Sequence, residues 1–191
     1  MNKRQIGPST MLFPMPTLLV AVKTGENSAN ILTIAWGGIL CGRPPIIGIS
    51  VSKNHYSTPF LQKEGNFTVN LPSCKQDVQA DYFGVVTGTK DPDKAATCGL
   101  TLLPSKKVSS PLIAECPVNL ECRTYQEIEF STSILFMGEV VETHLDEAIL
   151  DERGRIVTER LDPLVFMRNI EYRRIGDFVS KPFSVGRQLV K

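Results

Sequence analysis

The sequence lacks the features that identify several large classes of protein. No uninterrupted apolar run in its 191 residues approaches the roughly 20 needed to cross a membrane. The apolar patch from Met11 is interrupted by Pro14 and Pro16 and has no small-residue cleavage site after it, so we expect no signal peptide. The formal net charge is only +1, which provides no long-range attraction for nucleic acid or an anionic membrane. We expect a cytoplasmic protein with neither partner.

Cysteine is scarce and scattered, and no C-x-x-C pair occurs. The five cysteines are Cys41, Cys74, Cys98, Cys116 and Cys122. An odd number without paired spacing argues against a zinc site or a disulfide framework, so we expect reduced thiols and no bound metal. The chain also lacks a G-x-G-x-x-G segment after a strand, so we expect no separate dinucleotide-binding domain.

What the chain does contain is the composition of a soluble globular protein, with 42% hydrophobic and 21% charged residues. Its length suits one domain with a substantial core, spanning residues 1–191. We find no internal repeat and no low-complexity stretch.

Short strands dominate the predicted secondary structure. We expect strands at residues 17–22, 30–36, 46–52, 67–71, 118–125 and 134–143, the last broken at Gly138, and an irregular connection at 37–45. We expect helices at 59–64, 75–83 and 91–98, the first closed by a left-handed Gly65. These helices are too short and irregular for a regular βαβ series, so the pattern predicts a mostly antiparallel barrel or sandwich.

The turn after the third strand is basic and rich in hydroxyl groups. Thr58 is a predicted N-cap and Pro59 a predicted first helical residue. A helix start offers free N–H groups, Lys53 adds a positive charge, and Ser52 and Ser57 add further donors. Residues 50–58 therefore make a plausible seat for a phosphate monoester, although a solvated strand-to-helix turn would have the same pattern.

Three predicted strands pair a bulky apolar face with a small, uncharged one. The small faces carry Thr33, Ala35, Gly48, Ser50, Ser52, Thr68 and Asn70. A solvated sheet face usually carries Lys, Glu or Arg, and none occurs on these faces. Small residues leave room for a flat ligand that hydroxyl and amide groups can orient, while a solvent face that happens to be small is the alternative.

Four ordered segments, at residues 30–38, 43–52, 55–58 and 65–72, resemble the flavin reductase-like family, which includes flavoredoxins. Their sequences are NILTIAWGG, RPPIIGISVS, HYST and GNFTVNLP, and weaker similarity to the family follows at residues 138–141 and 172–176. The resemblance implies a mostly β fold with short helices, namely a split antiparallel β-barrel that binds FMN. It also implies that the tail, from about residue 163 to 191, packs on the barrel or on a partner subunit.

The resemblance further implies noncovalent FMN at the interface of a homodimer. NADH or NADPH would be a transient donor, and a small molecule or a protein would be the redox partner. By the resemblance, Thr33, Ala35 and Trp36 lie along the flavin ring, and Asn70, Leu71 and Pro72 complete its pocket. The remaining expected cofactor-binding residues, mostly around the ribityl chain and phosphate, are Ile34, Ser50, Ser52, Lys53, His55, Tyr56, Ser57 and Thr58.

If FMN is bound, the flavin performs the redox chemistry, and we expect no dedicated acid–base residue. Cys41 and His144 are the two candidates for a role near the flavin. A lone cysteine is more often a small buried hydrophobe, and a lone histidine is more often a surface residue.

Three other functions stay open. The same barrel would serve a non-catalytic flavin-binding or electron-carrier module, and a β-rich interaction protein without a ligand would use the small faces for dimer packing. A pyridoxamine phosphate oxidase-like barrel also seats FMN, but the pattern of residues 30–72 fits that family poorly.

Overall fold

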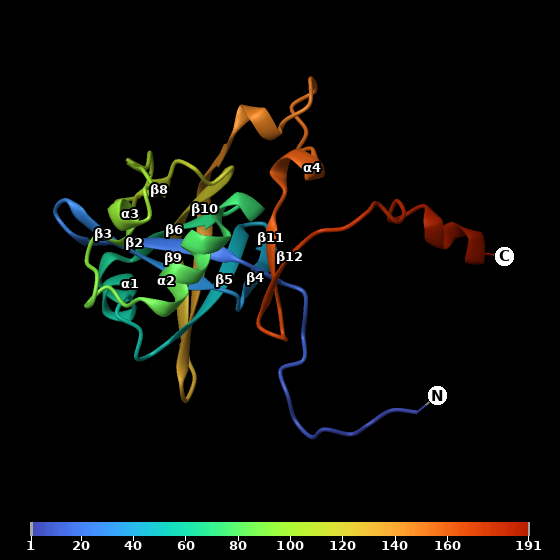
Figure 1. The fold of residues 1–191 in the computed structure, drawn as a ribbon, viewed down its shortest axis with the longest axis horizontal. Helices are drawn as coiled ribbons and strands as arrows, with labels where there is room; N and C mark the ends of the chain where they lie inside the picture. The colour runs from blue at the N-terminus through green and yellow to red at the C-terminus, as the bar shows by residue number, and fades with distance from the viewer. Residues whose placement is uncertain (1, 191) are drawn as a thin grey trace.

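Alternating apolar residues build seven strands into one antiparallel sheet in the computed structural model, which describes residues 2–190 (Figure 1). The strand order is β3-β2-β6-β9-β10-β5-β4. The strands are β2 (Leu18–Gly25), β3 (Ser28–Ile34), β4 (Gly37–Gly42), β5 (Pro45–Ser52), β6 (Asn66–Leu71), β9 (Val118–Glu129) and β10 (Ser133–Leu145). The Ser50 N–H donates at 2.8 Å to the carbonyl of Trp36, the residue before β4, and so extends the pairing of β4 with β5.

The bulky faces of the strands meet in one core. Its buried members include Leu18, Val20, Leu32, Ile34, Ile49, Val51, Phe67, Val69, Cys122 and Phe136. The small faces of β3, β5 and β6 therefore all point away from this core. The predicted mostly β, antiparallel fold is confirmed, and Thr33 and Ser50 lie on the same outer side of the sheet.

Short helices cover part of that outer side and form a second core. They are η1 (Cys74–Gln76), α2 (Asp77–Val85) and α3 (Lys94–Thr97), followed by β7 (Leu102–Leu103) and β8 (Leu112–Ile113), whereas α1 (Thr58–Glu64) packs its Leu61 into the first core. Leu19 and Ile31 of the sheet pack here with Ala80 and Phe83 of α2. Gly65 closes α1 with the predicted left-handed backbone, at φ 61°.

The two ends of the chain meet beside the barrel and then leave it. A three-stranded sheet joins β1 (Met15–Pro16), β11 (Leu164–Met167) and β12 (Glu171–Arg174). Between β10 and β11 lie η2 (Glu147–Ile149) and α4 (Thr158–Leu161), and the chain ends with η3 (Val185–Leu189). Figure 1 shows both termini extending away from the body on the same side. None of the helices in residues 2–190 has the length and apolarity that a membrane crossing requires.

Four local predictions were wrong. Residues 37–42 form β4 rather than an irregular connection, because Gly37 and Gly38 pair closely with β5; a Cβ on Gly37 would lie 2.7 Å from Leu18 Cδ1. The strand at Gly138 is continuous, and the glycine instead marks a bulge packed against Phe67.

The predicted helix 91–98 is reduced to α3. Thr58 is not the N-cap of α1; Ser57 occupies that position and makes no capping hydrogen bond.

Candidate functional site

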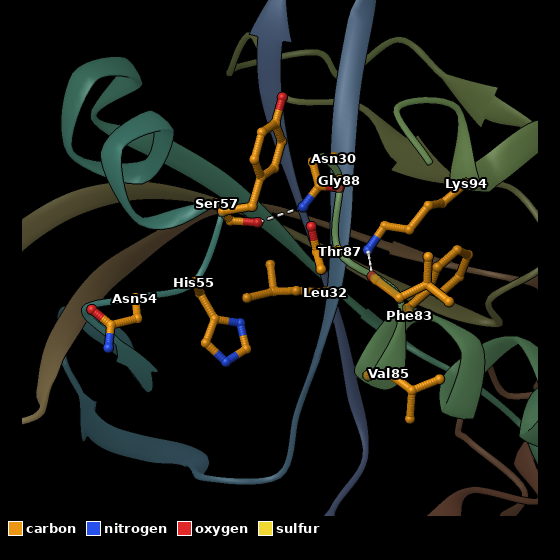
Figure 2. A pocket seen from close by; sticks show the side chains of 13 residues that line it. Asn30, Leu32, Asn54, His55, Ser57, Phe83, Val85, Thr87, Gly88 and Lys94 are labelled. Atoms are coloured by element: carbon orange, nitrogen blue, oxygen red, sulfur yellow. Dashed lines mark hydrogen bonds between the residues drawn. The ribbon is translucent and has the colours of Figure 1, made fainter. Parts of the chain in front are cut away.

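A pocket of about 180 Å³ lies where the turn after β5 faces the end of α2 (Figure 2). We call it the Lys94 pocket, and its walls are Asn30, Leu32, Asn54, His55, Tyr56, Ser57, Phe83, Gly84, Val85, Val86, Thr87, Gly88 and Lys94. It therefore brings together β3, the predicted phosphate-binding turn and a segment more than 25 residues further along the chain.

Lys94, at the start of α3, is buried, with 3% of its surface exposed. Its ammonium donates to the Val86 carbonyl at 2.9 Å and lies 5.7 Å from the centroid of the Phe83 ring. An ammonium has three N–H donors, and among residues 2–190 Lys94 makes only this one hydrogen bond. Burial lowers the pKa of Lys94 to about 8, although nearby Asp91 acts in the opposite direction. The pocket thus holds a costly, incompletely partnered positive charge.

His55 enters the pocket from the opposite wall (Figure 2). Its pKa lies below the ordinary value because of burial first and the charge of Lys94 second. The walls of the pocket include no carboxylate in the part of the chain that the structure describes. An anion placed between these two side chains would favour the charged form of both.

Asn30 adds an orienting amide. Its Nδ2 donates to Ser57 Oγ at 2.5 Å, while its Oδ1 is buried and has no partner among the described residues. Gly88 closes the wall: a Cβ there would lie 2.4 Å from the Tyr56 ring and 2.6 Å from Asn30 Oδ1. The unpaired amide oxygen is suited to accept a hydrogen bond from a ligand hydroxyl.

The structure brings only part of the predicted phosphate seat to the pocket. His55, Tyr56 and Ser57 line it. Thr58 instead donates to the Ser52 carbonyl at 2.8 Å. Lys53 pairs with Glu129 of the β9–β10 hairpin and does not line the pocket. The roles of Ser52, Lys53 and Thr58 as phosphate contacts stay predictions.

The predicted ring-binding residues of β3 and β5 lie on or near the outer side of the barrel. Thr33 Oγ1 donates to the Ala80 carbonyl of α2 at 2.5 Å, Ser50 is half-buried, and Ile34 belongs to the core. Ala35 and Trp36 line a second cavity of about 480 Å³, the Trp36 recess, together with Gly37 and the N-terminal residues Thr10, Leu12, Pro14, Met15 and Pro16. Trp36 is 53% exposed, so its ring is available for contact.

The third predicted segment, residues 70–72, makes hydrogen bonds and packing contacts within the fold. Asn70 is fully buried, donates to the Leu19 carbonyl at 3.0 Å and accepts from the Ile113 N–H at 3.1 Å. Leu71 packs against the barrel core, and the Pro72 carbonyl accepts from the Leu164 N–H. None of the three lines the Lys94 pocket or the Trp36 recess.

Neither catalytic candidate lines the Lys94 pocket. The Cys41 thiol donates to the Arg43 carbonyl at 3.4 Å. His144 Nε2 lies 2.7 Å from Oε1 of the buried Glu121. Within residues 2–190, no three His, Cys, Asp or Glu side chains are grouped so as to hold a metal ion.

Sequence reasoning missed Lys94 and the wall formed by residues 83–88. A single sequence has no signal that separates a buried lysine from a solvated one, because the burial arises from packing of α3 against α2. The two glycines, Gly84 and Gly88, were the only local signal of a close approach at this wall.

The model of the flavin reductase like domain matches residues 10–176. The structure of flavoredoxin from Desulfovibrio vulgaris (Miyazaki F) is similar, with 34% identity and a TM-score of 0.90, over 97% of this chain and 100% of that one. Flavoredoxin from Methanosarcina acetivorans has 28% identity and a TM-score of 0.91, over 99% and 100%.

A third structure, the FMN-binding protein from Thermus thermophilus, is 21% identical with a TM-score of 0.78, over 95% of this chain and 99% of that one. Its likeness shows the fold alone. Together these structures identify the architecture as the predicted split β-barrel.

Proposed function

This chain belongs to the flavin reductase-like family, and we propose that it is an FMN-dependent oxidoreductase. It would pass hydride or electrons from NADH, NADPH or a redox partner, through the flavin, to an acceptor. The observation that carries the proposal is the buried, under-partnered ammonium of Lys94, which faces His55 in a pocket without a carboxylate.

The pocket fits the phosphate end of the cofactor. Lys94 and His55 would hold the phosphate, and the unpaired Asn30 Oδ1 would accept from a ribityl hydroxyl. Cavities for whole ligands are typically ~300–1,000 Å³, so the pocket suits only the narrow end of FMN. The exposed Trp36 and its recess offer apolar surface for the planar end.

Bound flavin would supply the redox chemistry, accepting a hydride or electrons and passing them on. The residues of this chain would bind and orient it. Lys94 would neutralise the phosphate charge, and Asn30, held by Ser57, would fix the ribityl chain. Trp36 would limit access of water to one side of the ring.

The test starts from the purified protein, which should be yellow and release FMN on denaturation. In the cofactor-free protein, Lys94→Ala should weaken FMN by about 30-fold or more, the cost of removing a partner from a charge-assisted bond. Riboflavin lacks the phosphate and should lose little. Protein that neither contains FMN nor binds added FMN would overturn the proposal, and equal losses for the two ligands would refute the phosphate assignment.

Lys53→Ala is the matched control, because Lys53 is paired with Glu129 outside the pocket. We expect it to change the FMN affinity less than Lys94→Ala does. A larger loss of FMN affinity in Lys53→Ala than in Lys94→Ala would indicate that the phosphate binds at the turn formed by residues 50–58 instead.

A second candidate function is an electron-carrier module, favoured by the 34% identity to a flavoredoxin over nearly the whole chain. A carrier would exchange electrons with a protein partner, and nicotinamide would reduce its flavin no faster than it reduces free flavin. Comparing the two rates in parallel separates the candidates.

We also propose that the protein is a homodimer. Large apolar side chains are exposed at the N-terminal segment, on β4 and at the C-terminus, including Leu12, Ile39 and Phe183. Exposed apolar surface of this extent is typical of protein interfaces. Sedimentation of the purified chain tests this directly, and a monomer at micromolar concentration would contradict it.

A further inference from the structure

The last described residues of the chain, 175–190, form a tail whose first four residues border a cavity with residues 158–163 and whose remainder extends beyond the body. Figure 1 shows it running outward from β12 and ending far from the barrel. Its backbone hydrogen bonds are local, such as Val185 N–H to the Lys181 carbonyl and Val190 N–H to the Arg187 carbonyl. We call residues 175–190 the C-terminal tail.

The tail is nevertheless apolar. Phe178, Val179, Phe183 and Leu189 are between 75% and 92% exposed. So much apolar surface on an extended segment is costly in water and is typical of a segment that binds another surface. From residue 177 on, the tail also lies beyond the matched domain, whereas the two flavoredoxins match 97% and 99% of this chain.

A complementary hollow lies on the barrel. A cavity of about 590 Å³, the β4 groove, is lined by Ile39, Cys41, Gly42, Pro45, Ile46, Ile47, Leu120, Val140, Val141, Glu142 and Thr143. Ile39 on its rim is 83% exposed. Strand β4 pairs with β5 on one side and is the end strand of the seven-stranded sheet; among the described residues no strand pairs with its other edge, although β1 lies near it, so that edge can accept an added strand.

We propose that the C-terminal tail of one protomer docks in the β4 groove of a second copy, and that the exchange is reciprocal. Among the described residues Glu142 is the one charged side chain that lines the groove, and the tail carries one acidic and two basic side chains (Asp177, Lys181 and Arg187), so its net positive charge is complementary. Apolar groups would fill the groove, and the extended start of the tail would run along the open edge of β4.

The area is sufficient for a stable dimer. Phe178 and Phe183 each supply about 150–250 Å² when buried. Two exchanged tails thus supply roughly 600–1,000 Å² from four side chains, before the facing grooves are counted. The sum reaches the ~1,200–2,000 Å² of a standard interface.

This inference rests on the proposed homodimer, and the experiment separates the two. The full chain, the chain ending at Gly176, and full-length Phe178→Asp/Phe183→Asp are compared by sedimentation over a range of concentrations. We expect the last two to raise the dimer dissociation constant by at least ~30-fold, as loss of hot-spot side chains does. The matched control is Val78→Asp, an apolar side chain on α2 that is 72% exposed, which should leave the constant unchanged.

Ile39→Asp tests the groove and should weaken the dimer as the tail variants do. A photocrosslinking residue at position 178, used in a mixture of isotopically labelled and unlabelled chains, should join a labelled to an unlabelled chain at peptides lining the groove. Crosslinks within one chain only would overturn the exchange. If the full-length chain is a monomer, both the proposed homodimer and the tail exchange are contradicted. If the dimer is unaffected by loss of the tail, only the tail exchange is contradicted.

Discussion

One buried lysine sets the charge of the Lys94 pocket. Burying an ammonium is unfavourable unless its donors are satisfied, and the Val86 carbonyl satisfies one of three. The lowered pKa of about 8, caused first by burial, expresses that cost. A phosphate would complete the shell and return the pKa toward its ordinary value, so binding and protonation are coupled.

The coupling predicts how FMN affinity depends on pH. At pH 7 Lys94 is protonated in the free protein, and a phosphate monoester is close to a dianion. As the pH rises through about 8, the free protein loses that proton, so binding then has to take up a proton. We expect FMN affinity to fall between pH 7.5 and 9 (about tenfold per pH unit at most), as measured by fluorescence titration.

Riboflavin is the control for this titration, because it lacks the phosphate, and its affinity should be flat over the same range. Lys53→Ala should keep the slope seen with FMN. A slope of the same size for riboflavin would show that another group is responsible.

At the scale of elements, the pocket depends on how closely the end of α2 approaches the turn after β5. A side chain at Gly88 would clash with Tyr56 and Asn30, whereas a Cβ at Gly84 would make an ordinary contact with Thr33 Cβ at 3.6 Å. Both glycines line the pocket, but only Gly88 has no room.

We therefore expect Gly88→Ala to weaken FMN by about tenfold or more, since the wall must shift to admit the methyl group. Gly84→Ala, within a helix, should leave the affinity nearly unchanged. Titration of both variants with FMN, with circular dichroism to confirm folding, checks the difference. If Gly88→Ala changed the FMN affinity no more than Gly84→Ala does, the wall at Gly88 would not contact the ligand.

A second element-scale feature is the loop at residues 106–108, which a buried carboxylate fastens to β9. Glu121 accepts from the N–H groups of Lys106, Lys107 and Val108 at 2.8, 2.6 and 3.2 Å and contacts His144. Burial alone would raise the pKa of Glu121, but these hydrogen bonds outweigh it and the pKa lies below its usual value.

Glu121→Gln should destabilise the fold by about 2–3 kcal/mol, because a neutral amide replaces an acceptor that serves charge-assisted hydrogen bonds. Urea unfolding measures the loss, and Glu127→Gln, an exposed residue on the same strand, is the control. The contribution of Glu121 is present above its unfolded-state pKa and is lost as the pH falls through its lower folded-state pKa. Equal stability of the two variants would contradict the role of Glu121.

At the scale of the whole molecule, the described strands form antiparallel sheets, and no parallel nucleotide-binding layer accompanies them in residues 2–190. If NADH or NADPH is the donor, as proposed, we expect the nicotinamide to contact the bound flavin and leave again. We expect the rate of flavin reduction in stopped-flow experiments to rise in proportion to NADH or NADPH up to ~1 mM, the behaviour of a donor bound by less than about 4 kcal/mol. Saturation at micromolar donor would reveal a dedicated site.

Local pattern was enough to predict much of the fold. Alternation along the predicted strands at 30–36, 46–52 and 67–71 indicated which side chains enter the core, because residue spacing in a strand sets the face directly. Gly65 similarly indicated the end of α1, whereas the helix begins at Thr58, one residue before the predicted first residue Pro59. The order of the segments from Asn30 to Pro72 was enough to indicate the family.

Only the tertiary structure decided which charged groups meet. The sequence alone does not distinguish Lys53 from Lys94. In the folded chain Lys53 pairs with Glu129, which lies 76 residues further along the sequence, whereas Lys94 is buried beside Phe83. Asn70, an expected ligand contact, is hydrogen-bonded to the Leu19 carbonyl and the Ile113 N–H, and its contact with a ligand stays a prediction. Such pairings join residues far apart along the chain, and their energies depend on burial, which exists only once the barrel and its helices have closed over them.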